Sequence, residues 1–579
     1  MFGRKPQFCG VIMRELLATA TFQRLAELVV AMTGMVVAAR FYGEEGISVV
    51  NLTLPVLAFG LLLSVLNATG AGYRYSYELG RCDEAEAYRQ YGQAVIFSVV
   101  SGLALALVCY LGRDAYYEFM GASDKLYPLF YEYWPCLLLL IVLDPPLTLL
   151  QTVVYNDGDS RTCSAAIVVQ LAGNLILPYW FCSMMGIGGI SLGVACSSLL
   201  ALLVCLLHFV RPGNSIHFRR HFKWRDFIYN TRFSLDDALP LLYSGLFTLI
   251  LTKFIIGMHG EAYLPVLTVV VFLVEMCMLT DAIGQAVQPI VGVYRGEDNN
   301  AGIRKAMRLG TKLAVAEGLA GSALFFACSG LLPTAFNIDE PDVAAAVVTA
   351  ARILTPIPLA YSLLFLYCSY YLMIERVRLS VGIILMRDLV FSLALPVGLG
   401  AAFGFNGMWV GVALAPVAAL ALAAGVVLVR HGRRKFPLLL ERDGLNALSR
   451  DIVLNVDNIF TLQRHVEEFL KVHHVGTETK FKVMMLVEEL YMLTMEKNAG
   501  RRIIAECTVL TGKEITFVSR DTGIIFDITD SDSPVSSFRS FVVSSMMEQH
   551  TLRHYQLTTS FNRQMFKFPA VQAAGTQGE

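Results

Sequence analysis

The feature that most constrains this chain is a basic, polar interval between two long apolar stretches of matching sequence. The interval 211–232 carries six basic residues, and the flanking stretches, 14–210 and 236–431, are nearly continuously apolar. The segments that begin at Gly186 and at Gly404 have the same glycine spacing and share five identical positions. An internal repeat of this length predicts two copies of one large unit rather than a solenoid. Further pairs at nearly the same offset are Gly80 with Gly296, Phe119 with Phe336, and Arg161 with Arg378.

Composition indicates that the two apolar stretches lie in a membrane. Hydrophobic residues make up 55% of the 579 residues and charged residues only 16%, whereas charged residues are about 25% of a typical soluble domain. The expected fold class is therefore an all-α polytopic membrane protein. The twelve cysteines lie singly, without a CxxC pair, so neither a disulfide framework nor a metal site is expected. The basic start, Met1 to Arg14, is followed by a span-sized run, so we expect no cleavable signal peptide.

Twelve apolar runs of about 20 residues or more are predicted to be transmembrane helices, six in each repeat. Because six is an even number, the two repeats are expected to run parallel, related by an axis along the membrane normal. The runs are 18–40, 49–71, 91–112, 127–152, 161–181 and 187–210, then 236–258, 264–290, 307–332, 344–372, 378–403 and 407–430.

The charges of the loops predict how these spans are oriented. Loops on one side of the set hold most of the bases, including the interval 211–232, and loops on the other side hold several acids. Both termini are therefore expected on the cytoplasmic side of the cell membrane. The bases include Arg14, Arg74, Arg81, Arg295, Arg304, Arg376, Arg430 and Lys435, and the acids are Glu44, Glu45, Glu261, Asp339, Glu340 and Asp342.

The composition changes after Lys435, and residues 451–569 are no longer membrane-like. Apolar residues fall at helical spacing near Ile459 and Phe481, and alternating β-branched runs begin at Ile503 and Ile515. A further helical stretch near Phe538 and two short strands that end at Phe568 complete the expected order α-α-β-β-α-β-β. The chain is thus predicted to end in a small α+β domain.

Three segments of the apolar part resemble the multidrug and toxic compound extrusion (MATE) family of exporters. They are 284–296, which begins Gly-Gln-Ala, 156–161, which reads Asn-Asp-Gly-Asp-Ser-Arg, and 189–195. The resemblance covers about residues 14–430. It implies two six-helix lobes facing a central cavity, and exchange of H+ or Na+ for amphipathic, often cationic drugs.

Charged and polar residues inside the predicted spans are the candidates for cation and substrate binding, because they are costly in a membrane. Glu27 could line the cavity or could pair with Arg24. Lys253 could face Glu275 and Asp281 across one lobe, as a relay or as an internal ion pair. The resemblance adds Asn174, which could instead form an interhelical hydrogen bond. It also adds Gln285 and Gln288, which could line the cavity, although Gln285 could instead bridge helices. It also places a base at Arg387, where a structural role is expected, and Gly189, Gly193, Gly407 and Gly411 are read as packing residues.

Two positions depart from the family pattern. The family commonly has an acid near the end of its first span, where this chain has Gly34, and a second acid four residues after Asn174, where this chain has Pro178. The familiar cation site of the first lobe is therefore absent, and coupling must use other acids.

The C-terminal domain resembles the ATP-binding fold of histidine kinases and anti-sigma-factor kinases. Glu489 would stand for the general base, and Asp521 and Gly523 for the adenine-binding turn. Leu493 stands where a Mg2+-binding Asn is expected, and a glycine-rich lid is missing, so triphosphate would be poorly held. The prediction is a degenerate regulatory or assembly module without ATPase or kinase activity.

The combined reading is a cation-coupled efflux transporter of the cytoplasmic membrane with a regulatory cytoplasmic domain. Its partners would be a small-molecule substrate, the lipid bilayer and possible cytoplasmic regulators, without nucleic acid or a cofactor. Two alternatives stay open: a flippase for a lipid-linked saccharide, and a membrane sensor with a kinase-type output domain. The expected divisions are an N-terminal tail 1–13, a first lobe 14–210, a linker 211–235, a second lobe 236–431, a linker 432–450, the α+β domain 451–569 and a tail 570–579.

Overall fold

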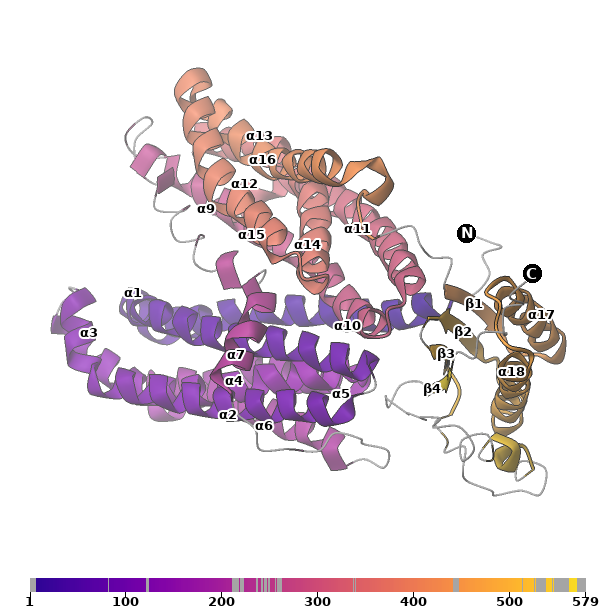
Figure 1. Ribbon diagram of the computed structural model, residues 1–579. Coiled ribbons are helices and arrows are strands. Elements are labelled where there is room, and N and C mark those ends of the chain that lie inside the picture. Colours follow the sequence, from indigo (N-terminus) through magenta and orange to yellow (C-terminus); the bar gives the residue numbers. More distant parts are fainter. Residues whose placement is uncertain are drawn as a thin grey trace.

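The structure, a computed structural model, contains two groups of long helices and a small α+β domain at one end of them (Figure 1). It describes the chain except for 1–6, 82, 121–123, 211–217, 219–222, several positions between 236 and 262, 337, 339, 441–446, 513, 525, 527–537, 544, 546–561 and 570–579. The side chains of 28, 30–32, 35, 44, 47, 51, 124, 264 and 569 are also outside the description.

The first lobe is built from long apolar helices that pack side by side. Its first helix, α1, is broken at Gly43, where the backbone has a φ of 58°. Helix α7 (Trp224–Thr231) and a 3-10 turn (Arg232–Ser234) connect this lobe to the second. The helices of the first lobe are α1 (Phe8–Gly80), α2 (Glu84–Leu111), α3 (Arg113–Met120), α4 (Tyr127–Asn156), α5 (Ser160–Met185) and α6 (Gly188–Leu206).

The labelled helices of the second lobe run from α9 to the long helix α16, which is bent at Gly404, and described helical positions between 238 and 257 precede α9. A 3-10 turn at Cys277–Asp281 separates α9 from α10, so the run expected as one span contains an irregular turn at its middle. A π-helical turn, Met386–Phe391, separates α15 from α16. The helices are α9 (Leu264–Met276), α10 (Ala282–Gly296), α11 (Asn300–Cys328), α12 (Leu332–Ala335), α13 (Pro341–Ile353), α14 (Ile357–Met373), α15 (Val377–Leu385) and α16 (Ser392–Lys435).

By length and apolar composition, eight helices in the described part of the chain could cross a membrane. The number is nine if the bent pair Pro341–Ile353 and Ile357–Met373 forms one span. Part of the expected seventh span, 236–258, lies outside the described residues. The count of twelve therefore stays a prediction.

The two glycine-rich segments that begin at Gly186 and Gly404 contain similar turns between helices. Gly186 and Gly404 both adopt a left-handed backbone, with φ of 81° and 72°. A Cβ on Gly193 would lie 2.4 Å from Pro178 N, and a Cβ on Gly411 would lie 2.5 Å from Pro396 Cα. Glycine at these sites therefore allows two consecutive helices to pack closely, which is the packing role expected for them.

The two lobes meet along α1 and α10, and we call this contact the seam. A Cβ on Gly80 would lie 2.9 Å from Gly296 Cα, so no larger residue fits at the crossing. Four residues earlier on each helix, a Cβ on Gly292 would lie 3.0 Å from Ser76 Cβ. The lobes are thus in contact at the end of the seam that lies next to the α+β domain (Figure 1).

The α+β domain has four antiparallel strands in the order β1-β2-β3-β4 and two long helices. The strands are β1 (Ala447–Val453), β2 (Ile504–Thr511), β3 (Glu514–Asp521) and β4 (Asn562–Pro569), and the helices are α17 (Val456–Val472) and α18 (Thr477–Lys497). The expected order was wrong at its start, because a strand precedes the helices. Only one strand is described where two were expected at the end, and residues 538–543 are helical as predicted.

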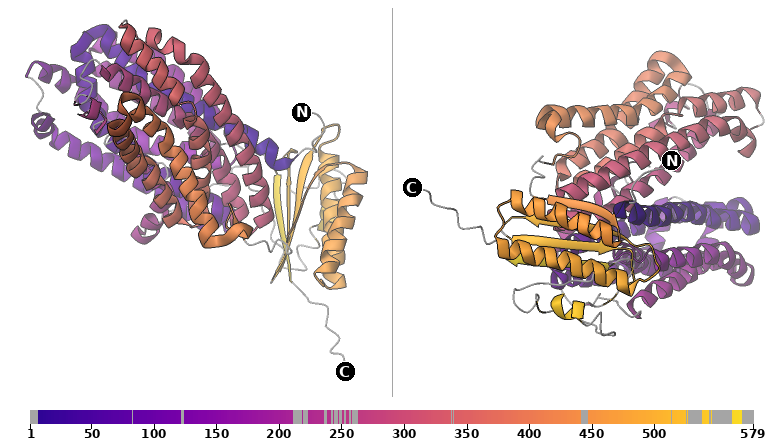
Figure 2. Two further views of the ribbon diagram at one scale, coloured as in Figure 1. Left: turned by 90° about the horizontal axis from the view of Figure 1, so that it is seen from above. Right: turned by 90° about the vertical axis from the view of Figure 1, so that its right-hand side faces the viewer.

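The sheet lies between the helices α17 and α18 and the two lobes (Figure 2). Side chains of successive strand residues point to opposite faces. One face supplies apolar side chains such as Val509, Phe517 and Phe566 to the core shared with α17 and α18. The other face carries charged side chains toward the lobes.

Candidate functional site at the seam

A single arginine from the first lobe connects the two lobes in the middle of the apolar region. Arg24 of α1 forms an ion pair with Asp281, which is 4% exposed and belongs to the second lobe. A second nitrogen of the Arg24 guanidinium, Nη1, lies 2.9 Å from Glu27 Oε2. With its amide oxygen turned toward the guanidinium, Gln285 also accepts hydrogen bonds from Arg24. The structure therefore brings three predicted residues, Glu27, Asp281 and Gln285, to one site around Arg24.

Two further carboxylates, one in each lobe, extend this site. Asp144 of α4 accepts a hydrogen bond of 2.9 Å from Ser64 Oγ and interacts electrostatically with Glu27. Glu317 of α11 interacts electrostatically with Asp281 and has a buried Oε2 without a hydrogen-bond partner in the described part of the chain. Two carboxylates of each lobe thus belong to the site around Arg24. We call these four, Glu27, Asp144, Asp281 and Glu317, the seam carboxylates. An excess of acids at such a site can be neutralised by a proton or a small cation.

Neither Asp144 nor Glu317 was selected from the sequence, although both carry the signal that selected Glu27. Each is an acid within an apolar run that is long enough to span a membrane. Asp144 precedes two prolines and Glu317 precedes Gly318. An acid in such a run deserves the same functional hypothesis as any other intramembrane charge.

The structure does not bring Lys253 together with the two acids that were expected opposite it. Lys253 is exposed, and among the described residues no ion pair joins it to Glu275 or Asp281. Arg24 reaches Asp281 from the other lobe instead. The 3-10 turn between Glu275 and Asp281 also separates them: Asp281 faces the seam, while Glu275 lines a cavity inside the second lobe.

This second-lobe cavity has a volume of about 370 Å3. Its wall is largely apolar and aromatic, with Tyr243, Phe247 and Tyr361 beside Glu275. Arg387, 1% exposed, borders it and is held by a bidentate pair with Asp388 at 2.7 and 2.8 Å. The Arg387 guanidinium also lies 4.6 Å from the Phe365 ring centroid. An apolar cavity with a few polar groups is the usual form of a small-molecule site.

The remaining predicted membrane residues lie apart from Arg24. Asn174 is fully buried in α5, and neither side-chain atom has a hydrogen-bond partner in the described part of the chain. The interhelical hydrogen bond expected as its alternative role is therefore not formed. Gln288 lines a small space of about 10 Å3 with Gln285 and Thr69.

The segment 156–161 has a structural role at the end of α4. Asp159 caps α5 by accepting a hydrogen bond of 3.1 Å from Thr162 N, and Asp157 accepts one of 2.9 Å from Tyr75 OH. Both carboxylates contact His208, at 2.9 and 3.1 Å. The cluster fixes the connection between three helices of the first lobe.

A second charged site lies where the sheet meets the lobes. Four charges, Asp451, Glu506, Arg520 and Arg563, are direct neighbours across β1, β2, β3 and β4. Lys305 of α11 contacts both acids of this row, and Glu297 at the end of α10 contacts both arginines. Burial would raise the pKa of Glu506, but Arg520 and Lys305 hold that pKa below its usual value. We call these six residues the docking row.

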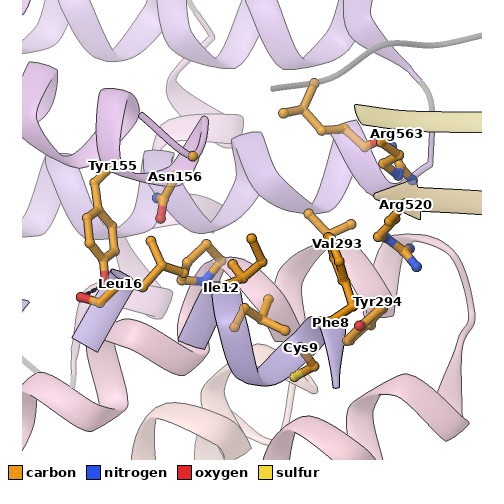
Figure 3. A pocket seen from close by; sticks show the side chains of 14 residues that line it. Phe8, Cys9, Ile12, Leu16, Tyr155, Asn156, Val293, Tyr294, Arg520 and Arg563 are labelled. Carbon is orange, nitrogen blue, oxygen red and sulfur yellow. Dashed lines mark hydrogen bonds between the residues drawn. The ribbon is translucent and has the colours of Figure 1, made fainter. Parts of the chain in front are cut away.

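The docking row also reaches the first lobe. Arg563 donates hydrogen bonds of 3.0 and 3.2 Å to the carbonyl oxygens of Leu79 and Gly80, where α1 crosses α10. Phe8 N at the start of α1 donates to Asp451. Figure 3 shows Arg520 and Arg563 beside a cavity of about 60 Å3 lined by both lobes. One sheet face thus holds both lobes where they touch.

The residues expected to bind nucleotide are engaged within the domain. Asp521 Oδ1 accepts hydrogen bonds of 2.9 Å from Gly523 N and from Asn562 Nδ2. Burial raises the pKa of Asp521 to about 6. The Glu489 carboxylate pairs with Arg539, at 2.5 Å, from the short helical segment 538–543. One oxygen of each carboxylate is thus engaged by a group of the domain itself.

Comparison with known proteins supports the fold. The protein-family description that matches is MatE, over residues 20–180. A solved structure of MATE in complex with MaD5 is 19% identical and has a TM-score of 0.64, covering 72% of this chain and 94% of that chain. A mutant of the Vibrio cholerae MATE transporter VcmN is 15% identical with a TM-score of 0.65, covering 73% of this chain and 98% of that chain. A MOP superfamily transporter from Pyrococcus furiosus is 16% identical with a TM-score of 0.64, covering 74% of this chain and 98% of that chain. This chain therefore has the MATE fold over most of its length, while no curated protein matches it by sequence.

Proposed function

We propose that this protein is a secondary active efflux transporter that exchanges H+ or Na+ for amphipathic drugs or other xenobiotics across the cytoplasmic membrane. The observation that carries the proposal is the set of seam carboxylates around Arg24. Within this set, the ion pair of Arg24 with Asp281 joins the two lobes of a MATE fold. Separation of the lobes at the seam would break this ion pair. A transporter whose lobes rock against each other needs such a contact to form and break.

The second-lobe cavity supports binding of an amphipathic cation. Aromatic faces attract cations at distances of up to about 6 Å, and a carboxylate adds charge complementarity. Glu275 has no ion-pair partner in the part of the chain that the structure describes, so its carboxylate can serve a ligand. Asn174, Gln288 and Lys253 remain weaker candidates, because they are not among the described residues that line this cavity.

The C-terminal domain is proposed to be a regulatory module that does not hydrolyse ATP and that lies, with the N-terminus, in the cytoplasm. Its docking row bonds to both lobes on the side where the loop bases gather. Leu493 at the metal position and the ion pair of Glu489 with Arg539 support the absence of turnover. Release of phosphate from ATP by the purified protein at a rate that falls with Asp521→Asn would contradict it.

The test of the proposed function is flux in reconstituted vesicles. Full-length protein should accumulate ethidium, an amphipathic cation, when a pH or Na+ gradient is imposed in the direction of exchange. Vesicles without a gradient should show only leakage. The same is expected of vesicles whose gradient an ionophore has dissipated. Equal uptake with and without both gradients would contradict secondary transport. Movement of a fluorescent lipid-linked saccharide but not of ethidium would favour the flippase alternative.

A further inference from the structure

The second lobe has a basic cavity that neither the seam nor the docking row uses. It has a volume of about 840 Å3 and lies among the turn before the second lobe, the α14–α15 connection and the end of α16. Four arginines line it, Arg232, Arg376, Arg378 and Arg430, against one acid, Glu375. The lining therefore carries three uncompensated positive charges.

Most of these basic groups have no ion-pair partner among the residues that the structure describes. In the described part of the chain, no ion pair is formed by Arg376, Arg378 or Arg430. Arg232 Nε and His431 Nδ1 are buried and have no hydrogen-bond partner within that part. The Arg232 guanidinium stacks 3.4 Å from the Tyr229 ring centroid, which holds it in place. A buried donor without a partner is costly, so a bound acceptor would relieve Arg232 Nε.

The rest of the wall is largely apolar and lies beside exposed apolar side chains of α16. Leu379, Ile383 and Val426 line the cavity, and Leu422, at its edge on α16, is 41% exposed. The same helix exposes Val429 at 87%. A ligand that fits must therefore combine an anionic, hydrogen-bonding head with apolar chains.

We propose that this cavity binds the phosphate headgroup of an anionic phospholipid, whose acyl chains lie along α16. Basic pockets between transmembrane helices near the cytoplasmic side are suited to such headgroups, and planar guanidinium groups bind phosphate oxygens in pairs. Because nearly all of the lining belongs to one lobe, the lipid is a bound component of that lobe and not a molecule passing along the seam.

The test counts lipids that stay bound to the full-length protein in detergent by native mass spectrometry. Dioleoylphosphatidylglycerol should be retained, and dioleoylphosphatidylcholine, which lacks net charge, should be lost. The double variant Arg376→Gln/Arg430→Gln should weaken retention of phosphatidylglycerol about 30-fold, equivalent to about 2 kcal/mol for two charges. The matched pair Arg433→Gln/Arg434→Gln, on exposed positions of the same helix end, should leave it unchanged.

A second variant tests the cavity without altering charge. An added Cβ on Gly382 meets no atom within 4 Å, so Gly382→Phe can fill the space without a clash at its base. It should also displace the lipid. The proposal would be overturned if both arginine pairs lost phosphatidylglycerol equally, or if phosphatidylcholine were retained as well as phosphatidylglycerol. It would also be overturned if inorganic phosphate alone displaced the lipid as strongly as added phosphatidylglycerol does. Because retention is measured without substrate or gradient, a failure of the proposed transport function would leave this result standing.

Discussion

Asp281→Asn should reduce gradient-driven ethidium uptake to the level of empty vesicles while the protein still folds and reaches the membrane. Asp281 is the second-lobe partner of Arg24, so its removal abolishes the ion pair across the seam. Arg24 keeps Glu27 as a partner at 2.9 Å, and the variant therefore leaves no unpaired guanidinium. Loss of one intramembrane carboxylate removes a group that a transported cation could neutralise.

The control for Asp281→Asn is Glu340→Gln, which neutralises an exposed acid far along the chain from the seam. It should transport at the parent rate. Asp144→Asn and Glu317→Gln should lower uptake if the whole set of seam carboxylates takes part, and Glu275→Gln should raise the substrate concentration needed for half-maximal uptake. Parent-level uptake by Asp281→Asn under a gradient would show that coupling does not use this residue.

Glu297→Gln should detach the cytoplasmic domain from the lobes and expose Cys9. Glu297 pairs with both Arg520 and Arg563, and all three side chains are at most 2% exposed. Breaking a buried ion pair by removing one partner costs about 3–5 kcal/mol. Cys9 is 1% exposed beneath the sheet, where burial raises its pKa to about 12 and keeps it unreactive. Labelling of Cys9 by a maleimide, followed by peptide mass spectrometry, should become at least about 100-fold faster.

The neighbouring Asp298 provides a matched control for the docking row. Asp298 is exposed, and asparagine tolerates its positive φ of 55°, so Asp298→Asn removes the same charge without touching the row. In this variant the maleimide should label Cys9 at the parent rate. If Glu297→Gln also labels at that rate, the docking row does not hold the domain in place.

Local sequence was a good guide to elements whose formation depends on local chemistry. Long apolar runs became helices, and residues 515–518 became part of a strand whose alternate side chains enter a core. Strand β1 was missed because Arg450 and Asp451 make its sequence read as a polar linker. It forms because each of its residues finds a partner in β2, which lies more than 50 residues away along the chain.

The pair of Arg24 with Glu27 was one of the expected alternatives, but the pairing of charges between separate segments could not be predicted from the sequence in the same way. Glu27 and Asp281 were identified because a charge in an apolar run is conspicuous, but their shared partner Arg24 lies in a different lobe from Asp281. The docking row joins residues from six separate elements, and each acid in it looks like an ordinary surface charge in its own segment. Only the packing of sheet against lobes shows that these charges are buried and complementary.

The most direct test of the account is a reversible cross-link across the seam. Disulfides join Cβ atoms about 3.5–4.5 Å apart, and a Cβ on Gly292 would lie 3.0 Å from Ser76 Cβ, so a small relaxation allows Ser76→Cys/Gly292→Cys to close. The pair Gly173→Cys/Ser197→Cys has the same 3.0 Å geometry inside the first lobe. The account predicts that oxidation stops ethidium flux in the seam pair, that reductant restores it, and that the first-lobe pair and the single variants transport throughout. Full flux through a protein whose seam is cross-linked would contradict movement of the two lobes at this contact.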